Sequence, residues 1–281
     1  MEASPIGFGT YQLKGQECYD AVKCAIETGY TLIDSATVYK NEEQIGKVLK
    51  DTNTRNSLFI TSKLAPADQG YDSCMAAVEL SLKKMEQTQL DLYLIHWPGT
   101  SKLQPSDPNN HKNRSNSYKA LESCKNEGKV RYIGVSNYTM THLRQLLEEC
   151  SIKPYLIQNE CHPLYYDHDL IDYCKENKII YQAYSSFGGS GNMNLVNHFS
   201  DHYIGDKVES ITKKHSKSLP QVLLKWALEK GLYIIPKATS KAHIKANFDL
   251  NFHLDDKDMN QLDRLKDDYP NKFSWDPESI Q

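Results

Sequence analysis

Eight short apolar runs alternate with amphipathic segments along most of the chain, and this alternation restricts the fold more than any other feature. The runs have the length of strands, whereas the segments between them repeat apolar residues at helical spacing. Strands separated by helices predict a parallel α/β sheet, because each helix returns the chain to the edge where the next strand starts. A count of eight strands favours a closed (β/α)8 TIM barrel over an open doubly wound sheet. The expected strands are residues 5–9, 31–35, 58–63, 90–96, 132–136, 156–161, 179–185 and 233–237.

The length of 281 residues suits one large barrel or two smaller domains, and the repeated alternation favours a single domain over residues 1–281. The expected helices are residues 19–28, 41–49, 74–85, 118–126, 140–149, 170–176 and 210–230. Residues 99–117 form the longest polar connection and follow the fourth expected strand. We expect this connection over the mouth of the barrel, either as a solvated loop or as a substrate-specificity loop.

Composition limits the classes of function. A formal net charge of −3 provides no global basic field, so neither a nucleic acid nor an anionic membrane is an expected partner. The N-terminus has no basic segment followed by an apolar one, and no apolar stretch is long enough to span a bilayer. Seven cysteines without a CxxC pair predict reduced thiols in a cytoplasmic protein and no zinc or other metal site.

Charged side chains stand at the ends of three apolar runs. Asp34, Lys63 and His96 lie near the C-terminal ends of the second, third and fourth expected strands, and Tyr39 follows Asp34 closely. Since side chains alternate along a strand, each of the three shares a face with the apolar residues before it. Each alone has a structural explanation, such as a buried ion pair. Together, at the face where barrels carry their active sites, they predict protonation of a carbonyl oxygen during hydride transfer.

Five longer motifs carry a family resemblance. The segments 29–42, 94–98, 134–137, 157–163 and 234–237 read GYTLIDSATVYKNE, LIHWP, GVSN, IQNECHP and IIPK. They resemble, in order, signatures of the aldo-keto reductase family, and the resemblance runs from about residue 7 to about residue 277. It implies a (β/α)8 barrel that binds NADP(H) in extended form at its C-terminal face. In agreement, no GxGxxG dinucleotide motif follows a strand near the start of the chain.

The resemblance assigns the catalytic roles. Tyr39 matches the general acid, a phenol that ordinarily titrates near pH ~10. Lys63 matches the cation expected to ease release of its proton, and Asp34 matches the carboxylate that pairs with this lysine. His96 matches the imidazole that orients the carbonyl group and helps to donate to its oxygen. Tyr11 and Trp97, with His96, are the expected substrate-binding residues, and Phe187 is expected nearby.

The resemblance also assigns cofactor contacts. Side chains that hold the nicotinamide carboxamide are matched by Ser136, Asn137 and Gln158. Tyr184 matches the aromatic ring that stacks on the nicotinamide, and Ser185 beside it belongs to the same expected site. Contacts to the phosphates and adenine of NADPH are matched by Lys237, His243 and Asn247.

Several positions depart from the family pattern. The chain lacks the short N-terminal hairpin that closes the bottom of many such barrels, and Ala65 replaces a common tryptophan. Near the expected adenosine phosphate, Ala238, His243 and Ala246 stand where serine, arginine and an acidic residue are usual. We therefore expect NADPH as cofactor by a reduced margin, with NADH as a weaker alternative. His162 and Glu42 are interpreted as structural, the latter through the helix dipole.

The sequence thus predicts an NADPH-dependent reductase of aldehydes or ketones, with monomer as the family default. Two alternatives remain. One is a non-catalytic NADP(H)-binding relative, such as a sensor, a channel subunit or a lens protein. The other is a lyase that uses Lys63 to form a Schiff base, which pairing with Asp34 disfavours because the ion pair keeps the amine protonated.

Overall fold

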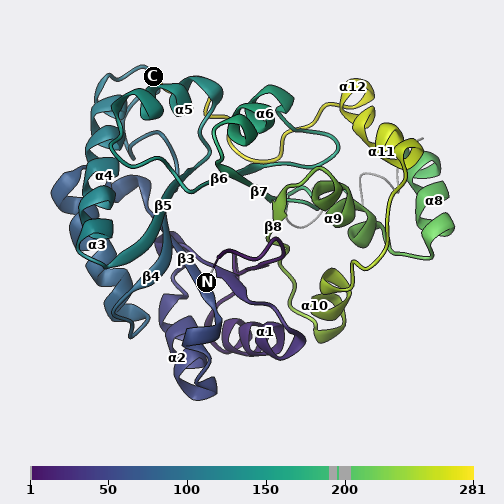
Figure 1. Cartoon of the computed structure of the whole chain (residues 1–281), viewed down its shortest axis with the longest axis horizontal. Coiled ribbons are helices and arrows are strands. Elements are labelled where there is room, and N and C mark those ends of the chain that lie inside the picture. The colour runs from purple at the N-terminus through teal and green to yellow at the C-terminus, as the bar shows by residue number, and fades with distance from the viewer. Residues whose placement is uncertain (1, 190–194, 196–203) are drawn as a thin grey trace.

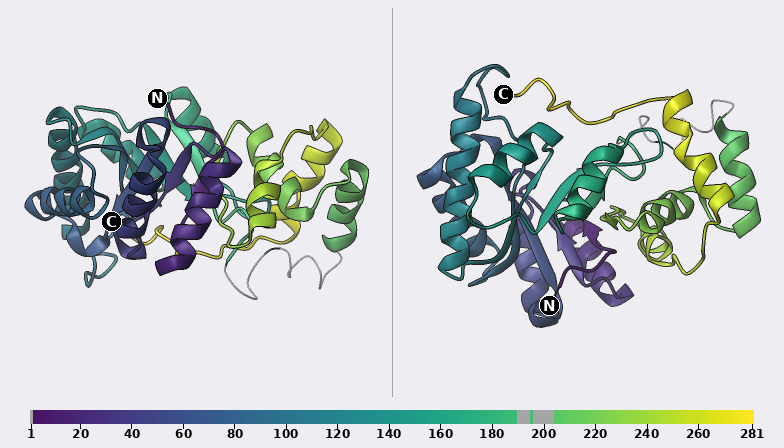
Figure 2. Two further views of the ribbon diagram at one scale, coloured as in Figure 1. Left: turned by 90° about the horizontal axis from the view of Figure 1, so that it is seen from below. Right: turned by 45° about the horizontal axis from the view of Figure 1, so that its top comes forward.

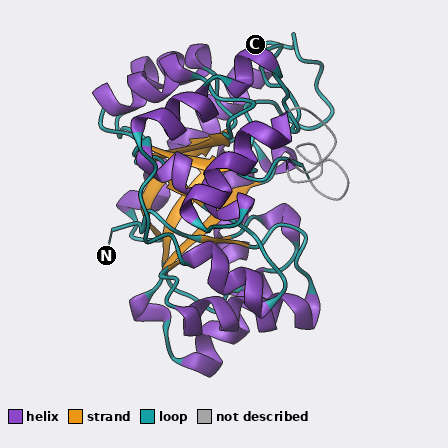
Figure 3. Cartoon of the chain, turned by 90° about the vertical axis from the view of Figure 1, so that its right-hand side faces the viewer, coloured by secondary structure: helices purple, strands orange, loops and turns teal. Residues whose placement is uncertain are grey.

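The computed structural model describes residues 2–189, 195 and 204–281. All eight strands belong to one sheet in the order β1 to β8, and neighbouring strands are parallel. Helices surround the strands on the outside, as Figures 1 and 3 show. The expected (β/α)8 architecture is confirmed. The strands are β1 (Phe8–Gly9), β2 (Leu32–Asp34), β3 (Phe59–Leu64), β4 (Leu90–Ile95), β5 (Val130–Ser136), β6 (Leu156–Glu160), β7 (Ile180–Tyr184) and β8 (Tyr233–Ile234).

Six of the seven expected helices are present, several with different boundaries. The helices are α1 (Gly15–Thr28), α2 (Glu42–Thr52), α3 (Tyr71–Lys84), α4 (Asn109–Asn126), α5 (Met140–Glu149), α6 (His168–Glu176), α8 (Ile204–His215), α9 (Leu219–Glu229), α10 (Lys241–Phe248), α11 (Asp256–Asp263) and α12 (Leu265–Asp268). The single helix expected over residues 210–230 is wrong. Ser216 adopts a left-handed backbone with φ 52°, and Ser218 begins α9 with a capping box, so two helices form.

The expectation of a loop over residues 99–117 is also wrong, because α4 already begins at Asn109. The first turns of α4 bury polar side chains, so they lack the apolar spacing that marks a helix in sequence. Asn110 shows why they are buried. Its Oδ1 accepts from the backbone N–H of Thr100 at 2.9 Å, and its Nδ2 donates to the carbonyl oxygen of Gln104 at 2.8 Å. The helix start thus braces a shorter connection between β4 and α4.

Among the described residues, no hairpin precedes β1. Residues 2–7 contain one isolated bridge, between Ile6 and Ile234, and no strand. Hydrogen bonds of 2.8 Å link Gly7 N to Ile234 O and Ile234 N to Pro5 O, which joins the first and last strands. Stacked rings fill the N-terminal end of the barrel. Tyr132 and Tyr155 have ring centroids 4.0 Å apart, and Phe59 packs beside them.

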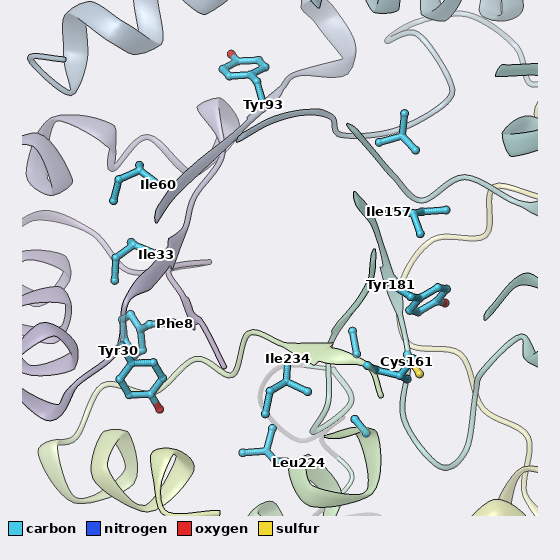
Figure 4. Close-up of a cluster of buried hydrophobic side chains, with 14 of the residues drawn as sticks. Phe8, Tyr30, Ile33, Ile60, Tyr93, Ile157, Cys161, Tyr181, Leu224 and Ile234 are labelled. Carbon is cyan, nitrogen blue, oxygen red and sulfur yellow. The ribbon is translucent and has the colours of Figure 1, made fainter. Parts of the chain in front are cut away.

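Alternation along the strands separates two apolar clusters. Outward side chains such as Ile33, Ile60 and Ile157 pack beneath the helices, as Figure 4 shows. Inward side chains fill the barrel and share their strand faces with the polar residues expected at the tips. The inward cluster contains Ala3, Leu32, Phe59, Leu92, Leu94, Leu156 and Ile235. The predicted faces of Asp34, Lys63 and His96 are therefore confirmed.

Gly134 permits a close contact between strands inside this barrel. A Cβ atom at Gly134 would lie 2.2 Å from Leu156 O and 2.8 Å from Leu94 Cδ2. Only a glycine fits unless β5 and β6 move apart.

We expect Gly134→Ala to lower the free energy of unfolding by about 3 kcal/mol, because backbone and packed side chain must both shift. The control is Gly128→Ala, where no atom lies within 4 Å of the added Cβ and the strain of φ 77° is the main cost. That strain contributes about 1–2 kcal/mol. Urea unfolding of both variants tests the difference. Equal destabilisation would contradict a steric role for Gly134.

Candidate active site

A buried ion pair lies at the C-terminal ends of β2 and β3. Lys63 Nζ donates to Asp34 Oδ1 at 2.6 Å and to the carbonyl oxygen of Ser35 at 2.8 Å. Both side chains are almost completely buried, at 0% exposure for Lys63 and 2% for Asp34. The other carboxylate oxygen, Asp34 Oδ2, accepts from Gln158 Nε2 at 2.8 Å. The charges are thus paired and hydrogen-bonded, which offsets much of the cost of burying them.

Tyr39 lies next to this pair. It ends the 3-10 helix η1 (Thr37–Tyr39), which the Thr37 hydroxyl attaches to the carbonyl oxygen of Lys63 at 3.0 Å. Lys63 Nζ is 5.1 Å from the centroid of the Tyr39 ring, and the ring of His96 meets it edge-on with centroids 5.7 Å apart. The structure therefore brings together all four residues expected to be catalytic.

Electrostatics hold Tyr39 in its protonated form. Burial raises the pKa of Tyr39 well above its usual value, and the negative charge of Asp34 raises it further. This direction is opposite to the easier proton release that we expected from Lys63. Two effects explain the difference: a phenolate is poorly solvated here, and the charge of Lys63 is already paired with Asp34. A phenol that keeps its proton is nevertheless in the state required of an acid.

His96 follows β4 and is neutral. Burial, followed by the charge of Lys63, lowers its pKa well below the usual range. Its Nδ1 atom is buried and has no hydrogen-bond partner among the described residues. A neutral imidazole carries one N–H, so His96 has the capacity to donate to a carbonyl oxygen. Its ring also lies beside Trp97, with centroids 6.4 Å apart.

The amide side chains expected at the cofactor site form one network beside the ion pair. Asn137 has a left-handed backbone, with φ 63°, directly after β5. Its Nδ2 donates to the carbonyl oxygen of His96 at 2.8 Å, and its Oδ1 accepts from the Tyr184 hydroxyl at 2.6 Å. Ser136 Oγ donates to the carbonyl oxygen of Gln158 at 2.7 Å. Ser136, Asn137, Gln158 and Tyr184 are thus held close to His96 and Asp34.

The residues expected at the phosphate end lie near or on α10. Ser240 caps this helix by accepting from the backbone N–H of His243 at 3.2 Å. Lys241 and His243 are exposed, whereas Asn247 is buried at 5% exposure. The side chains of Lys237, Lys241 and His243 form no ion pair with any other described residue. Cationic side chains at a helix N-terminus suit an anion.

We call Asp34, Tyr39, Lys63 and His96 the tetrad. Aromatic side chains line the mouth of the barrel beyond these four residues. Tyr11 is 56% exposed, and its ring is 5.1 Å from that of Tyr39. Trp97 meets Trp275 edge-on at 5.1 Å, and Trp275 is 51% exposed. Sequence reasoning missed Trp275, because it follows the last helix and belongs to no periodic pattern. Large exposed apolar side chains that cluster at a mouth can contact a bound ligand.

The structure also gives the partners and burial of the remaining residues that the sequence singled out. Glu42, interpreted through the helix dipole, also accepts from the Ser62 hydroxyl at 2.7 Å and lies 3.8 Å from Lys84 Nζ. His162 pairs with Glu160 at 3.0 Å, which gives it a structural partner. Ser185 follows β7 with a left-handed φ of 53° and is half-buried, as is Phe187.

Comparison with known proteins gives the family. Residues 5–267 match the model of the aldo/keto reductase family. The chain is 38% identical over 271 residues to a glyoxal reductase of Bacillus subtilis, covering 95% of this chain and 91% of the relative. It is 36% identical over 278 residues to a 9,11-endoperoxide prostaglandin H2 reductase of Trypanosoma cruzi, with 98% and 91% covered.

Solved structures agree with this assignment. An aldo-keto reductase from a Medee basin deep-sea metagenome superposes with a TM-score of 0.86 at 35% identity, covering 100% of this chain and 97% of the other. The chain therefore belongs to the aldo/keto reductase family and is an oxidoreductase of small carbonyl compounds. Membership in this oxidoreductase family argues against both alternatives that the sequence left open, the lyase and the non-catalytic NADP(H)-binding relative.

Among the described residues, no helix is both long and apolar enough to cross a bilayer.

We expect Lys63→Met to lower the free energy of unfolding by about 3–5 kcal/mol, because it leaves the Asp34 carboxylate buried without its partner. Adding Asp34→Asn to this variant should recover part of the loss. Lys50→Met is the control, since Lys50 pairs with Glu86 on the surface at 2.8 Å, and it should change stability little. Urea unfolding monitors all three. A Lys63→Met protein as stable as Lys50→Met would show that the pair does not support the fold.

Proposed function

We propose that this protein reduces aldehydes or ketones to alcohols, with NADPH as hydride donor and Tyr39 as proton donor. The observation that carries the proposal is the convergence of Tyr39, His96 and the Lys63–Asp34 pair at the barrel mouth. Family membership supports the reaction class, and members are typically NAD(P)H-dependent. The individual roles are those that the family resemblance implies, and the geometry of the site supports them.

Residues suited to a nicotinamide lie beside the tetrad. Gln158 Nε2 is occupied by Asp34 and Gln182, whereas Gln158 Oε1 accepts no hydrogen bond from the described residues. This oxygen is available to the amide N–H2 group of a nicotinamide. Ser136 and Asn137 would complete the polar surroundings, and the ring of Tyr184 offers a stacking surface. Lys237 and the N-terminal turn of α10 would hold the phosphates.

The reaction needs a proton at the carbonyl oxygen as electrons reach the carbonyl carbon. When bound, NADPH supplies the hydride. Tyr39 retains its proton until negative charge develops on the substrate oxygen, and then transfers it. Neutral His96 donates a hydrogen bond to the same oxygen and orients it. Lys63, whose Nζ lies 5.1 Å from the centroid of the Tyr39 ring, offsets part of the cost of the phenolate that remains.

The physiological substrate is best sought among small carbonyl compounds. The names of the two relatives refer to glyoxal and to a prostaglandin endoperoxide, which differ greatly in size. The aromatic mouth of this chain offers contacts for an apolar group, which glyoxal itself lacks. A carbonyl panel from methylglyoxal to aromatic aldehydes, monitored by NADPH and NADH absorbance, tests the proposed activity. No turnover of any carbonyl with either cofactor would refute it.

We expect Tyr39→Phe to lower kcat by ~10²–10⁴-fold, because a positioned acid is lost while the ring remains. Binding of NADPH, followed by quenching of protein fluorescence, should remain within about two-fold, since loss of one weak contact changes affinity little. Tyr71→Phe is the control, because Tyr71 is exposed and its hydroxyl bonds only to Ser123 among the described residues. Near-normal turnover by Tyr39→Phe would remove this residue from the role of acid.

We expect His243→Arg to tighten NADPH binding by about ten-fold, the change that ~1.4 kcal/mol produces. An arginine offers parallel charged hydrogen bonds to a phosphate that histidine lacks. NADH has no 2′-phosphate, so its affinity should not change. His168→Arg on α6 controls for net charge. Fluorescence titration gives both affinities. An unchanged NADPH affinity would show that the 2′-phosphate binds elsewhere.

A further inference from the structure

The chain after α12, residues 269–281, returns across the molecule from α12 to the neighbourhood of α4 and α5. Figures 1 and 2 show this C-terminal segment in yellow, crossing over a long distance without a helix or strand. Such a segment depends on side chains elsewhere for its position. Two attachments by buried side chains hold it, with Trp275 between them, and the backbone N–H of Asn271 also donates to the carbonyl oxygen of Leu164 at 3.1 Å.

The first attachment is Glu160, the last residue of β6, which is 2% exposed. Its Oε1 accepts from the backbone N–H of Phe273 at 2.7 Å, and its Oε2 accepts from that of Ser274 at 2.9 Å. Lys272 Nζ lies 3.4 Å from Oε2, and His162 Nε2 lies 3.0 Å from Oε1. One carboxylate thus binds two successive amides of the C-terminal segment.

The charge of Glu160 depends on these partners. Burial raises its pKa, but the hydrogen bonds from His162 and Phe273 and the charge of Lys272 lower it more, to about 2. Glu160 is therefore ionised at neutral pH. Charge-assisted hydrogen bonds of this kind are stronger than neutral ones. A glutamine at this position would direct its amide N–H2 at one of the two backbone N–H groups. Two donors cannot hydrogen-bond to each other, so one of these bonds would be lost.

The second attachment lies at the end of the described segment. Burial lowers the pKa of His142 to about 4, so its imidazole is neutral and donates from Nε2 to the carbonyl oxygen of Ile280 at 2.9 Å. Arg114 donates to the carbonyl oxygen of Gln281 at 2.6 Å, and the Gln281 N–H donates to Pro105 O at 3.0 Å. The segment is thus also tied to the connection that follows β4.

Trp275 comes directly after the part that Glu160 holds. Its ring meets Trp97 edge-on at 5.1 Å, and Trp97 follows His96 in the chain. Trp275 has no regular secondary structure of its own to fix it. The carboxylate of Glu160 thus holds the residue that precedes Trp275, next to the side-chain contact of Ser274 with Tyr184.

We propose that Glu160 is a positioning residue for substrate recognition: it holds residues 272–274 so that Trp275 forms, with Trp97, the wall that receives the apolar part of a carbonyl substrate. Glu160 acts through Trp275 and takes no part in proton transfer. This inference rests on the proposed reductase function, but attachment of the segment can be measured without turnover.

The decisive variant is Glu160→Gln, assayed as the full chain with NADPH. For 4-nitrobenzaldehyde we expect KM to rise roughly ten-fold with kcat nearly unchanged, since uniform binding of the apolar ring is lost. For methylglyoxal, which has no ring, kcat/KM should change by less than about two-fold. Trp275→Ala should show the same difference between substrates. The double variant should have a KM for 4-nitrobenzaldehyde no higher than that of Trp275→Ala, because both changes remove the same wall.

The matched control is Glu278→Gln, the same chemical change at an exposed position of the same segment. Tryptic cleavage after Lys272 gives a readout independent of catalysis, and it should accelerate in Glu160→Gln but not in Glu278→Gln. If the wild type reduces no carbonyl, the reductase function fails, while faster cleavage still supports the anchor. A folded Glu160→Gln protein with unchanged cleavage and unchanged KM for both aldehydes would overturn the proposal. If this variant does not fold, Glu160→Asp, which keeps the charge but shortens the reach, must show the same KM difference or the proposal fails.

Discussion

The buried pair of Lys63 and Asp34 is the interaction on which the rest of the site depends. The parallel register of β2 and β3 places Asp34 opposite Thr61, so Lys63 stands two residues farther along the same inner face. Isolated, either charge would be costly at this depth. As a pair, the positive charge of Lys63 and the negative charge of Asp34 nearly cancel, and Gln158 donates a further hydrogen bond to the carboxylate. Burial, together with the charges of this pair, sets the protonation states of Tyr39 and His96.

Both neighbours of the pair are neutral for the same physical reason. Burial penalises a phenolate and an imidazolium alike, so the pKa of Tyr39 rises and that of His96 falls. The site therefore offers two neutral donors beside a paired cation. Such an arrangement suits a reaction in which the substrate itself acquires the negative charge, because Lys63 balances the negative charge of the nearby Asp34 carboxylate.

The sequence was sufficient for the number and order of the strands, for their inward faces and for bringing Asp34, Lys63 and His96 together, since these depend on alternation and on position at a strand tip. It was insufficient where polar contacts replace apolar periodicity. The early start of α4 depends on Asn110, whose partners lie six and ten residues away along the chain. Trp275 and its anchor Glu160 lie more than a hundred residues apart in the chain, and no local pattern relates them.

The reacting groups and the substrate wall are built by different parts of the chain. Asp34, Lys63 and His96 come from or directly follow barrel strands, whose register fixes them to their neighbours by backbone hydrogen bonds. Trp97 and Trp275 come from a connection and a terminal segment that side-chain contacts hold in place. Changing the wall thus requires few backbone rearrangements, whereas changing the tetrad disturbs the barrel. Glu160 joins the two parts, because it belongs to a strand by its backbone and to the wall by its carboxylate.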